Sequence, residues 1–451
     1  MQKNEYTYLR FVRFKKLIQW DLKRYLNSSI QSKYETVGLK DLINEENKKY
    51  DISDKNSQYG ILGVNNQTGI FDAYIESGAN IKQKYKKMNA GWIAYNPYRI
   101  NVGSIGIKTN EHKFDYISPA YVVFSCKRSI FPEYLFLTMK TPTFSKIIRD
   151  NTTGSVRQNL SYEVLKELSI PLPTIEKQQA LVKTYNDKIL KAETLEKQAE
   201  EIEQNIEDYL LTELGIEQYL ETANIDKDTL KKDYKYLKFV KFKNIERWDC
   251  YNNEESSVMT KLKASSYPIF ELGNVYKFIQ RRWDKKEISF DYVEIGAVDP
   301  LKGILYAEKI QTVKAPSRAT QKIKTGDLII GTTRPYLKKF AIVTDKFNDC
   351  VCSSGFQVVA PKDTYNLLYL YEFLKSPIAI SQFELFMSGA LYPAITNKDL
   401  KKILIPLPPL KIQNAIIEHI SEQKSQIKEL RQQASELREK AKSDFEKSVF
   451  E

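Results

Sequence analysis

Two segments of the chain carry apolar residues at heptad spacing between charged and polar ones, and each segment follows an Ile-Pro-Leu-Pro sequence. The first starts at Ile170 and runs to about Leu214, and the second starts at Ile405, 235 residues later, and runs to the C-terminus. This pattern predicts two long amphipathic helices, each of which must bury its stripe, and the obvious partner for each is the other. The stripes contain Leu181, Tyr185, Ala192, Leu195, Ala199, Ile202, Ile206 and Tyr209, and Ile416, Ile420, Ile427, Leu430, Ala434, Leu437 and Ala441.

Each stripe is interrupted once at the same place, by Lys188 in the first helix and by Gln423 in the second. We interpret these as positions that specify the register of pairing, since one polar residue in an apolar seam does so at some cost in stability. The alternative is that both face solvent where the helices bend. The apolar residues expected to form the seam and to take part in partner docking are Leu181, Tyr185, Leu195, Ile202, Ile206, Ile416, Ile420, Ile427, Leu430 and Leu437.

The rest of the chain also repeats. Tyr8–Asp21 and Tyr236–Asp249 are identical at 8 of 14 positions, and shorter matches follow through both halves. Each half shows short apolar runs punctuated by Gly or Pro and then a Gly-led loop before its long helix, which predicts a mixed α/β module. Residues 33–87 and 267–324 share little. We expect a first module at 1–168, a first long helix at 169–216, a connector at 217–235, a second module at 236–403 and a second long helix at 404–451.

The net charge of +12, from 69 basic and 57 acidic residues, is unevenly distributed. Residues 174–214 contain 5 Lys and 10 acidic residues, and residues 409–451 contain 8 of each sign, so the modules carry the whole positive excess. A basic globular surface is typical of proteins that bind nucleic acid, although solvated surface lysines would account for part of it. The sequence has no run long enough to span a bilayer, no signal-peptide core and only four cysteines, so we expect a cytoplasmic protein.

Motifs for catalysis or for metal and cofactor binding are missing from the sequence. It has two histidines, His112 and His419, and the pair Cys350 and Cys352 lacks the second pair that a zinc site needs. No phosphate-binding glycine loop is present. Tyr95-Asn-Pro-Tyr98 lacks the second proline of the methyltransferase motif, and tripeptides such as Glu111-His-Lys113 are expected by chance. We therefore expect no catalytic residue, metal or cofactor in this chain.

The side chains that do suggest a function are those that contact DNA. Arg reads guanine, Asn and Gln read adenine, and Lys, Ser, Thr and Tyr hold phosphates. These types gather in two pairs of matched loops, around Arg99 and Arg334 and around Gly154 and Gly389, and in the variable part of the second half. For any single arginine a surface salt bridge is the simpler interpretation. The candidate DNA-binding residues are Arg99, Asn101, Thr153, Ser155, Arg157, Gln158, Asn159, Arg281, Arg282, Arg318, Thr333, Arg334, Tyr336, Lys338 and Tyr392.

Taken together, the doubled architecture resembles the specificity subunit of type I restriction–modification systems. The resemblance rests on two modules that each end in a Gly-led loop, at 154–160 and 389–395, followed by Ile-Pro-Leu-Pro and a long helix. It implies an antiparallel coiled coil and two modules that each read half of a split double-stranded DNA target. It also implies docking of two methyltransferase subunits with S-adenosylmethionine, and of restriction subunits that translocate DNA with ATP and Mg²⁺. The chain itself would be non-catalytic.

The family's architecture also implies that the helices act as a spacer between the two modules. About 40 helical residues span roughly 60 Å, which is enough to separate the modules by about one DNA turn. The competing hypothesis is a coiled-coil interaction scaffold without any DNA role, which would not need basic modules beside neutral or acidic helices. A self-sufficient methyltransferase or nuclease is disfavoured because the cofactor loop is missing.

Overall fold

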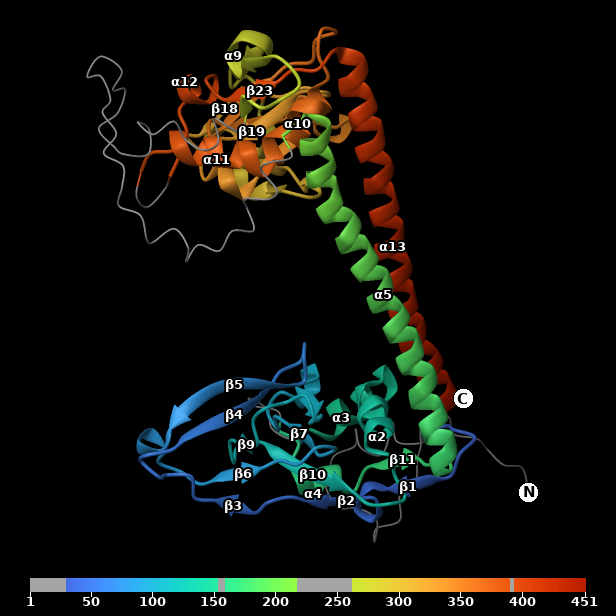
Figure 1. The fold of residues 1–451 in the computed structure, drawn as a ribbon. Coiled ribbons are helices and arrows are strands. Elements are labelled where there is room, and N and C mark those ends of the chain that lie inside the picture. The colour runs from blue at the N-terminus through green and yellow to red at the C-terminus, as the bar shows by residue number, and fades with distance from the viewer. Residues whose placement is uncertain (1–29, 153–158, 217–261, 390–392) are drawn as a thin grey trace. The chain divides into compact units, whose positions relative to one another are not determined.

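The computed structural model describes residues 30–152, 159–216, 262–389 and 393–451 (Figure 1). It divides into two compact units, unit 1 with residues 1–196 and 431–451 and unit 2 with residues 197–430. Both long helices, α5 (Ile175–Glu213) and α13 (Leu410–Phe450), contribute to both units. The connector and the repeated segments at 8–21 and 236–249 lie outside the described residues.

Unit 1 contains two sheets and a short strand pair that leads to the first long helix. The sheets have the strand orders β2-β10-β7-β8 and β3-β6-β9-β4-β5, and β4 and β9 are the parallel neighbours in the second sheet. The elements are β1 (Thr36–Gly38), β2 (Ile43–Glu45), β3 (Lys49–Tyr50), β4 (Gln58–Val64), β5 (Ile70–Ser77), β6 (Tyr85–Lys87), β7 (Ile93–Tyr95), β8 (Ile105–Ile107), β9 (Tyr116–Ile117), β10 (Val122–Cys126), α2 (Pro132–Lys140), α3 (Pro142–Asn151), α4 (Tyr162–Leu165) and β11 (Ser169–Pro171), with 3-10 turns η2 (Leu39–Asp41), η3 (Gly78–Asn80) and η4 (Ile100–Val102).

Unit 2 repeats this plan. Its two four-stranded sheets have the orders β13-β22-β19-β20 and β17-β14-β21-β18, and a separate pair joins β15 to β16. The elements are β12 (Ile269–Glu271), α9 (Leu272–Val275), β13 (Phe278–Ile279), β14 (Ser289–Val293), β15 (Val298–Asp299), β16 (Gly303–Ile304), β17 (Glu308–Gln311), β18 (Ala319–Lys322), β19 (Leu328–Gly331), β20 (Phe340–Ile342), β21 (Val351–Ser353), β22 (Phe356–Val359), α10 (Leu367–Lys375), α11 (Pro377–Phe386), α12 (Asn397–Leu400) and β23 (Leu404–Pro406), with 3-10 turns η7 (Ile295–Ala297), η8 (Thr312–Lys314), η9 (Pro335–Leu337) and η10 (Asp345–Phe347).

Most strands of the two units correspond even where the sequences diverge, although β3 in unit 1 and the pair of β15 with β16 in unit 2 have no counterpart. The order β6-β9-β4-β5 in unit 1 corresponds to β18-β21-β14-β17 in unit 2, and the parallel pair of β4 with β9 corresponds to that of β14 with β21. Of these strands, β4, β5 and β6 lie in the variable stretch 33–87, and β14, β17 and β18 lie in the variable stretch 267–324. The strand arrangement therefore persists where sequence identity is lost, because the alternation of buried and exposed positions is enough to specify a strand. The predicted mixed α/β modules, each followed by a long helix, are confirmed.

A buried glutamine fastens each module to its helix. Gln178, in the first turn of α5, donates from Nε2 to Pro173 O at 2.8 Å and accepts at Oε1 from Phe131 N at 2.8 Å. Gln413 of α13 makes the same two bonds, to Pro408 O at 2.8 Å and from Asn366 N at 3.0 Å. The side chains are fully or almost fully buried. Because Pro has no N–H to continue a ladder, side chains close the hydrogen bonding around the proline segment.

Buried tyrosines add a second link at the same junction. Tyr134 OH donates to Pro171 O at 2.8 Å, and its repeat Tyr369 donates to Pro406 O at 2.6 Å. The helices start later than the expected 169 and 404, because the first residues pair as strands. Ser169–Pro171 forms β11 against β1, and Leu404–Pro406 forms β23 against β12.

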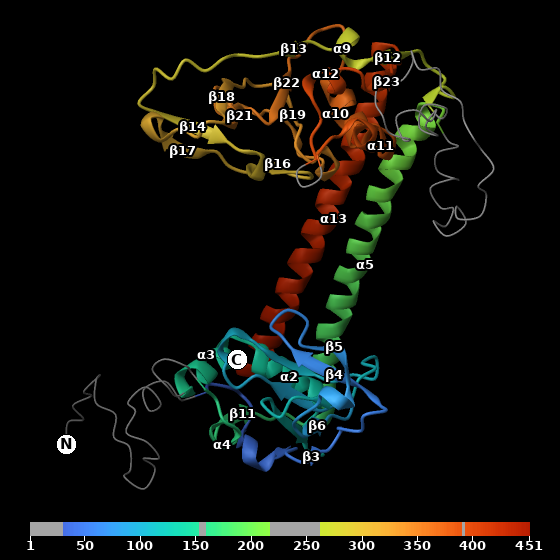
Figure 2. The ribbon, with the colours of Figure 1, turned by 90° about the vertical axis from the view of Figure 1, so that its left-hand side faces the viewer.

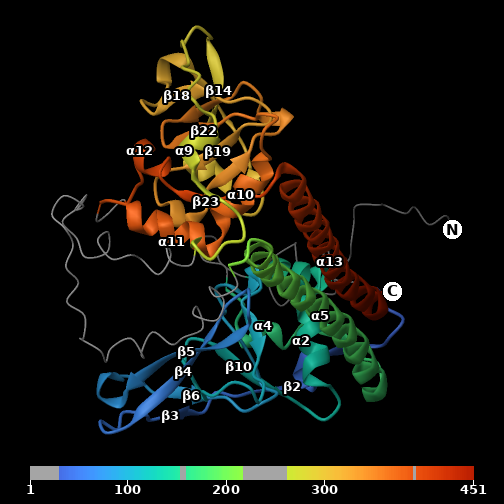
Figure 3. The same ribbon diagram turned by 45° about the horizontal axis from the view of Figure 1, so that its top comes forward.

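Inside each unit α5 and α13 run antiparallel, as Figure 3 shows. In unit 1, Ala192, Ala434 and Ala441 are buried to within 1 % exposure, so small side chains allow close approach of the helices. Phe445 lies between the rings of Tyr134 and Tyr185, with both centroid distances at 6.0 Å. In unit 2, Ile416, Ile420 and Ile427 join the module core with Ile206.

The two polar interruptions have different environments. Lys188 donates to Asp444 at 2.6 Å inside unit 1, and this ion pair lies beside a bidentate pair between Arg438 and Glu196. Gln423 in unit 2 is half-buried, and its Oε1 has no hydrogen-bond partner among the described residues. The shared sequence position therefore carries an interhelical ion pair in one unit only.

Replacing Gln178 by Ala tests the junction. The change leaves the buried Phe131 N–H and Pro173 carbonyl without partners, which costs about 2 kcal/mol of unfolding free energy. Gln413→Ala should cost a similar amount in unit 2. Chemical denaturation followed by circular dichroism measures both, with the exposed neighbour Gln179→Ala as the matched control. Equal stability of Gln178→Ala and Gln179→Ala would contradict the assigned role.

Candidate nucleic-acid interface

Two loops meet at the same place in each unit. In unit 1 the loop after β7 joins the segment before α4, because Leu160 N donates to Pro97 O at 3.0 Å and Tyr95 OH donates to Leu160 O at 3.1 Å. In unit 2, Ile395 N donates to Thr332 O at 3.0 Å. Leu160 and Ile395, like Pro97 and Thr332, are separated by the repeat offset of 235 residues. The loops that the sequence paired by similarity are therefore brought together in both units.

In unit 1 this loop pair presents a small set of the predicted DNA-binding residues. Arg99 is exposed, and Asn101 and Asn159 are half-buried. The same loop exposes Tyr98 to 55 % and Val102 to 59 %, two residues that the sequence reasoning did not select. Their position on either side of Arg99 was the available signal. Thr153, Ser155, Arg157 and Gln158 lie outside the described residues.

In unit 2 the matched loop has a strained backbone. Arg334 and Lys338 have φ angles of 49° and 52°, a left-handed conformation that non-glycine residues adopt only when their surroundings enforce it. Arg334 N donates to Pro393 O at 2.7 Å, and Thr333 forms a β-bridge with Ala394. Tyr336, between the two strained residues, is 38 % exposed. The tyrosine is therefore held outward by a fixed turn.

The contacts of two predicted residues in unit 2 point to structural roles. Lys338 donates to Glu207 of α5 at 3.1 Å, which ties the loop to the helix. Arg281 forms a bidentate ion pair with Asp327, whose side chain is fully buried. Removing the partner of a buried charge strongly lowers stability, so Arg281 is needed to compensate the buried carboxylate of Asp327. We therefore assign Arg281 a structural role and not a DNA contact, and we assign Lys338 the role of positioning the loop.

The remaining predicted arginines of unit 2, Arg282 and Arg318, are exposed. They lie next to β18 of the β17-β14-β21-β18 sheet and not in the loop that follows β19. Arg282 forms a β-bridge with Gln321, and the carbonyl of Arg318 accepts from Ser354 N at 2.7 Å. The structure thus separates the unit 2 candidates into two groups. Tyr392 lies outside the described residues.

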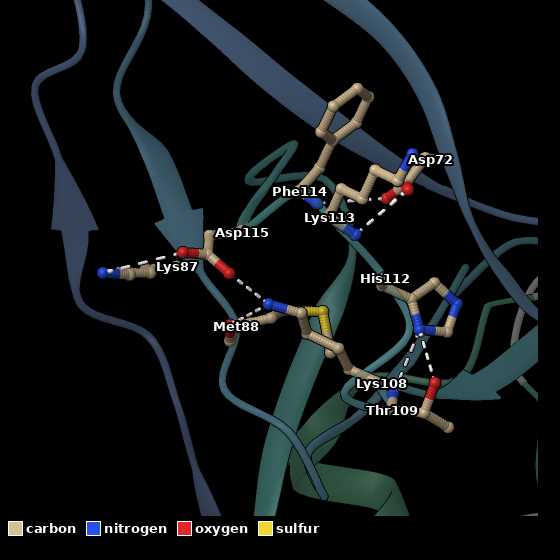
Figure 4. Close-up of polar contacts among 9 residues, drawn as sticks. All are labelled: Asp72, Lys87, Met88, Lys108, Thr109, His112, Lys113, Phe114 and Asp115. Atoms are coloured by element: carbon tan, nitrogen blue, oxygen red, sulfur yellow. Dashed lines mark hydrogen bonds and ion pairs between the residues drawn. The ribbon is translucent and has the colours of Figure 1, made fainter.

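A polar cluster in unit 1 contains Asp72, His112 and Asp115, which are residue types that catalytic sites use. Figure 4 shows that the groups of this cluster bind one another. Asp115 pairs with Lys108, whose Nζ also donates to Met88 O at 3.0 Å. His112 accepts at Nδ1 from Thr109 N at 3.1 Å, and Asp72 accepts from two backbone N–H groups, those of Lys113 and Phe114. The cluster therefore shapes the loop at 108–115 and has no pair of carboxylates facing an open site.

A groove of about 470 Å³ lies within unit 1 between α2, α5 and α13. Its walls are apolar at Phe136, Leu137 and Phe445 and charged at Lys140 and Glu446. Burial lowers the pKa of Lys140, and the nearby Lys442 adds to this effect. Glu446 accepts from Thr143 N at 2.7 Å at the start of α3, so one wall is braced by the C-terminal helix.

The described residues contain neither a cluster suited to a metal ion nor a helix suited to a membrane. Within them no group of three or more His, Cys, Asp or Glu side chains could hold a metal ion. Across the same ranges, none of the helices has the length and apolar character that crossing a bilayer requires.

Comparison with known proteins gives individual relatives at low identity. The chain is 25% identical over 167 residues to the HindI type I restriction enzyme specificity subunit of Haemophilus influenzae, a match of 36% of each protein. The matched part is thus about a third of that relative's length.

Solved structures show a similar fold. A chain solved in a study of complex assembly and conformational transition of the type I restriction–modification system has a TM-score of 0.55 at 16% identity, covering 92% of this chain and 97% of that one. The HsdS subunit from Thermoanaerobacter tengcongensis has a TM-score of 0.46 at 15% identity, covering 92% of this chain and 96% of that one.

The family comparison covers most of the chain. The type I restriction modification DNA specificity domain matches twice, over residues 31–204 and 265–438. Each match holds one module and most of the long helix that follows it, so the family unit and the sequence repeat coincide. The chain therefore belongs to the family of type I restriction–modification DNA specificity domains, with two such domains in tandem.

Proposed function

We propose that this chain is the DNA-recognition subunit of a type I restriction–modification complex and reads a bipartite target, one half with each unit. The main support for this proposal is that two loops meet at the same place in both units, through Leu160 and Pro97 in unit 1 and through Ile395 and Thr332 in unit 2, with different side chains beside that place. At matched positions unit 1 has Tyr98, Arg99 and Asn101, and unit 2 has Thr333, Arg334 and Tyr336, so the arginine is shared and the residues on either side of it differ. A common frame with different hydrogen-bonding groups is what two half-sites of different sequence require.

The charge distribution supports the same function. The modules carry the positive excess, and DNA-binding proteins release counterions by placing such cations against phosphates. The alternative of a coiled-coil scaffold has no use for this excess. Family membership makes the scaffold less favoured still.

We further propose that the chain is non-catalytic and acts through partners. The family resemblance implies two methyltransferase subunits that bind S-adenosylmethionine, and restriction subunits that use ATP and Mg²⁺. The outer faces of α5 and α13 and the groove of unit 1 are the surfaces we assign to methyltransferase docking. An apolar groove with charges at its rim has the composition typical of protein interfaces.

Alanine substitution in the loop pair tests the DNA assignment. In the complex reconstituted with its methyltransferase, Arg99→Ala should weaken binding to the cognate target about tenfold and relax selectivity in one half-site only. Tyr336→Ala should do the same in the other half-site. Fluorescence anisotropy across a salt series measures both effects.

Matched controls are Arg128→Ala and Lys362→Ala, which remove exposed cations away from the loop pairs. The controls should change affinity less than twofold. If Arg99→Ala and Tyr336→Ala leave cognate binding unchanged, the loops are not the reading surface. If the wild-type complex shows no bipartite preference in genome-wide mapping of methyladenine, the proposed function itself fails.

Shortening the helices tests their proposed role as a spacer. Lys188 pairs with Asp444 and Glu196 with Arg438, so residues 189–195 lie opposite residues 438–444 within unit 1. Deleting both removes roughly 10 Å of helix, equivalent to about three base pairs. Methyladenine mapping should return both half-sites with a shorter gap, or no modification. An unchanged gap contradicts the spacer role.

A further inference from the structure

Two aliphatic side chains of unit 2 stand almost fully in solvent at one end of the β14–β17 ladder. Ile288 and Val313 are each 91 % exposed, the highest values among the exposed large hydrophobic residues. Thr312 N donates to Ile288 O at 2.9 Å, so Val313 directly follows the residue that lies opposite Ile288 at the end of the ladder. We call Ile288 and Val313 the apolar tip. Exposed apolar groups on a soluble protein commonly mark a binding surface.

The backbone beneath the apolar tip is firmly held. Glu287, beside Ile288, accepts from Trp283 Nε1 at 2.7 Å and from Lys322 Nζ, and its carbonyl accepts from Thr312 Oγ1. The hydrogen bonds from Lys322 and then from Trp283 lower the pKa of the Glu287 carboxyl to about 2. Trp283 packs on Phe290 with ring centroids 4.1 Å apart. The exposure of the tip therefore belongs to an ordered surface and not to a loose loop.

The two segments that carry the apolar tip are rich in basic residues. The two segments that form it, 281–288 and 308–318, contain seven basic and three acidic residues. Arg282, Lys314 and Arg318 are exposed, whereas Glu287 is already paired with Lys322. Apolar residues flanked by basic ones complement duplex DNA. Its phosphates are anionic, and its major groove displays the apolar methyl groups of thymine.

The matched ladder end of unit 1 has a different chemical character. There Gly78 N donates to Ser57 O at 3.0 Å, and η3 follows at the place that η8 takes in unit 2. The Ser57 hydroxyl donates to Asp54 at 2.6 Å, and Asn80 donates to Glu76 at 2.9 Å. The backbone is thus the same, but small and polar side chains replace the aliphatic pair. The apolar tip belongs to unit 2 alone.

We infer that Ile288 and Val313 form a base-contacting tip that packs against thymine methyl groups in the major groove of the half-site read by unit 2. The inference rests on the proposed function. A two-stranded β-ribbon fits the major groove, and the thymine C5-methyl is the apolar group displayed there. Arg282, Lys314 and Arg318 hold the flanking phosphates. Figure 2 shows this sheet on the side of unit 2 away from α13, so a subunit docked on that helix leaves the tip open to DNA.

The test uses the complex reconstituted with its methyltransferase and DNA in which each thymine is replaced by deoxyuridine, one at a time. Deoxyuridine keeps every hydrogen-bonding group and lacks only the methyl. The wild-type complex should bind about fourfold more weakly at one or more positions in the unit 2 half-site, since one buried methyl group is worth about 0.8 kcal/mol. Replacement in the unit 1 half-site should have no effect that depends on the tip.

The double variant Ile288→Ser/Val313→Ser completes the cycle. It should bind the thymine target as weakly as wild type binds the deoxyuridine target, and deoxyuridine should weaken it no further. Its slope of log affinity against log salt should be unchanged, because the cations remain. Leu301→Ser, which alters a residue 67 % exposed elsewhere in unit 2, is the matched control and should behave as wild type.

Three outcomes overturn the inference. The first is wild-type affinity of the double variant together with the full deoxyuridine penalty. The second is a unit 2 half-site without any A·T pair, and the third is failure of the variant to assemble with the methyltransferase. The last result would assign the tip to a protein interface. Failure of the proposed function is recognised separately, because the wild-type complex would then show no preference for any bipartite target.

Discussion

Each unit depends on the buried junction between its module and its long helix. Prolines at the junction end the preceding strand and start the helix, but they remove the N–H groups that would join the two. Gln178 and Gln413 supply the missing connection with one side chain each, bonding to the proline carbonyl and to the backbone at the start of α2 or α10. The direction of each helix relative to its own module is set by these bonds and by the tyrosine that supports them.

The two units share the same backbone arrangement but differ in the side chains that they expose. Their loop joints superimpose in sequence position and in hydrogen bonding, whereas the exposed side chains beside them differ. The same contrast recurs at the ladder ends, where Ser57 in unit 1 corresponds to Ile288 in unit 2. A recognition protein benefits from this division, because the backbone can be kept rigid while exposed positions change at little cost in stability.

The charged residues show how burial decides their roles. Arg281 and Arg282 are adjacent in sequence, but Arg281 compensates the fully buried Asp327 and Arg282 lies in solvent. In unit 1, Lys108 and Asp115 satisfy each other and the backbone of one loop. Fewer basic residues are therefore available to DNA phosphates than the composition suggests. The available ones are those that do not form an ion pair with a nearby carboxylate.

Much of this architecture follows from local pattern. The repeat, the heptad stripes, the proline boundaries and the absence of catalytic motifs depend on spacings of a few residues, and they were enough to predict two α/β modules with two paired helices. The choice among exposed residues depended on the tertiary structure. Strand pairing brings Thr312 to Ile288 and Asp327 to Arg281 across tens of residues, and burial there is a property of the packed sheets. Sequence spacing cannot supply that information, because the same Arg-Arg pair would be equally exposed in an isolated strand.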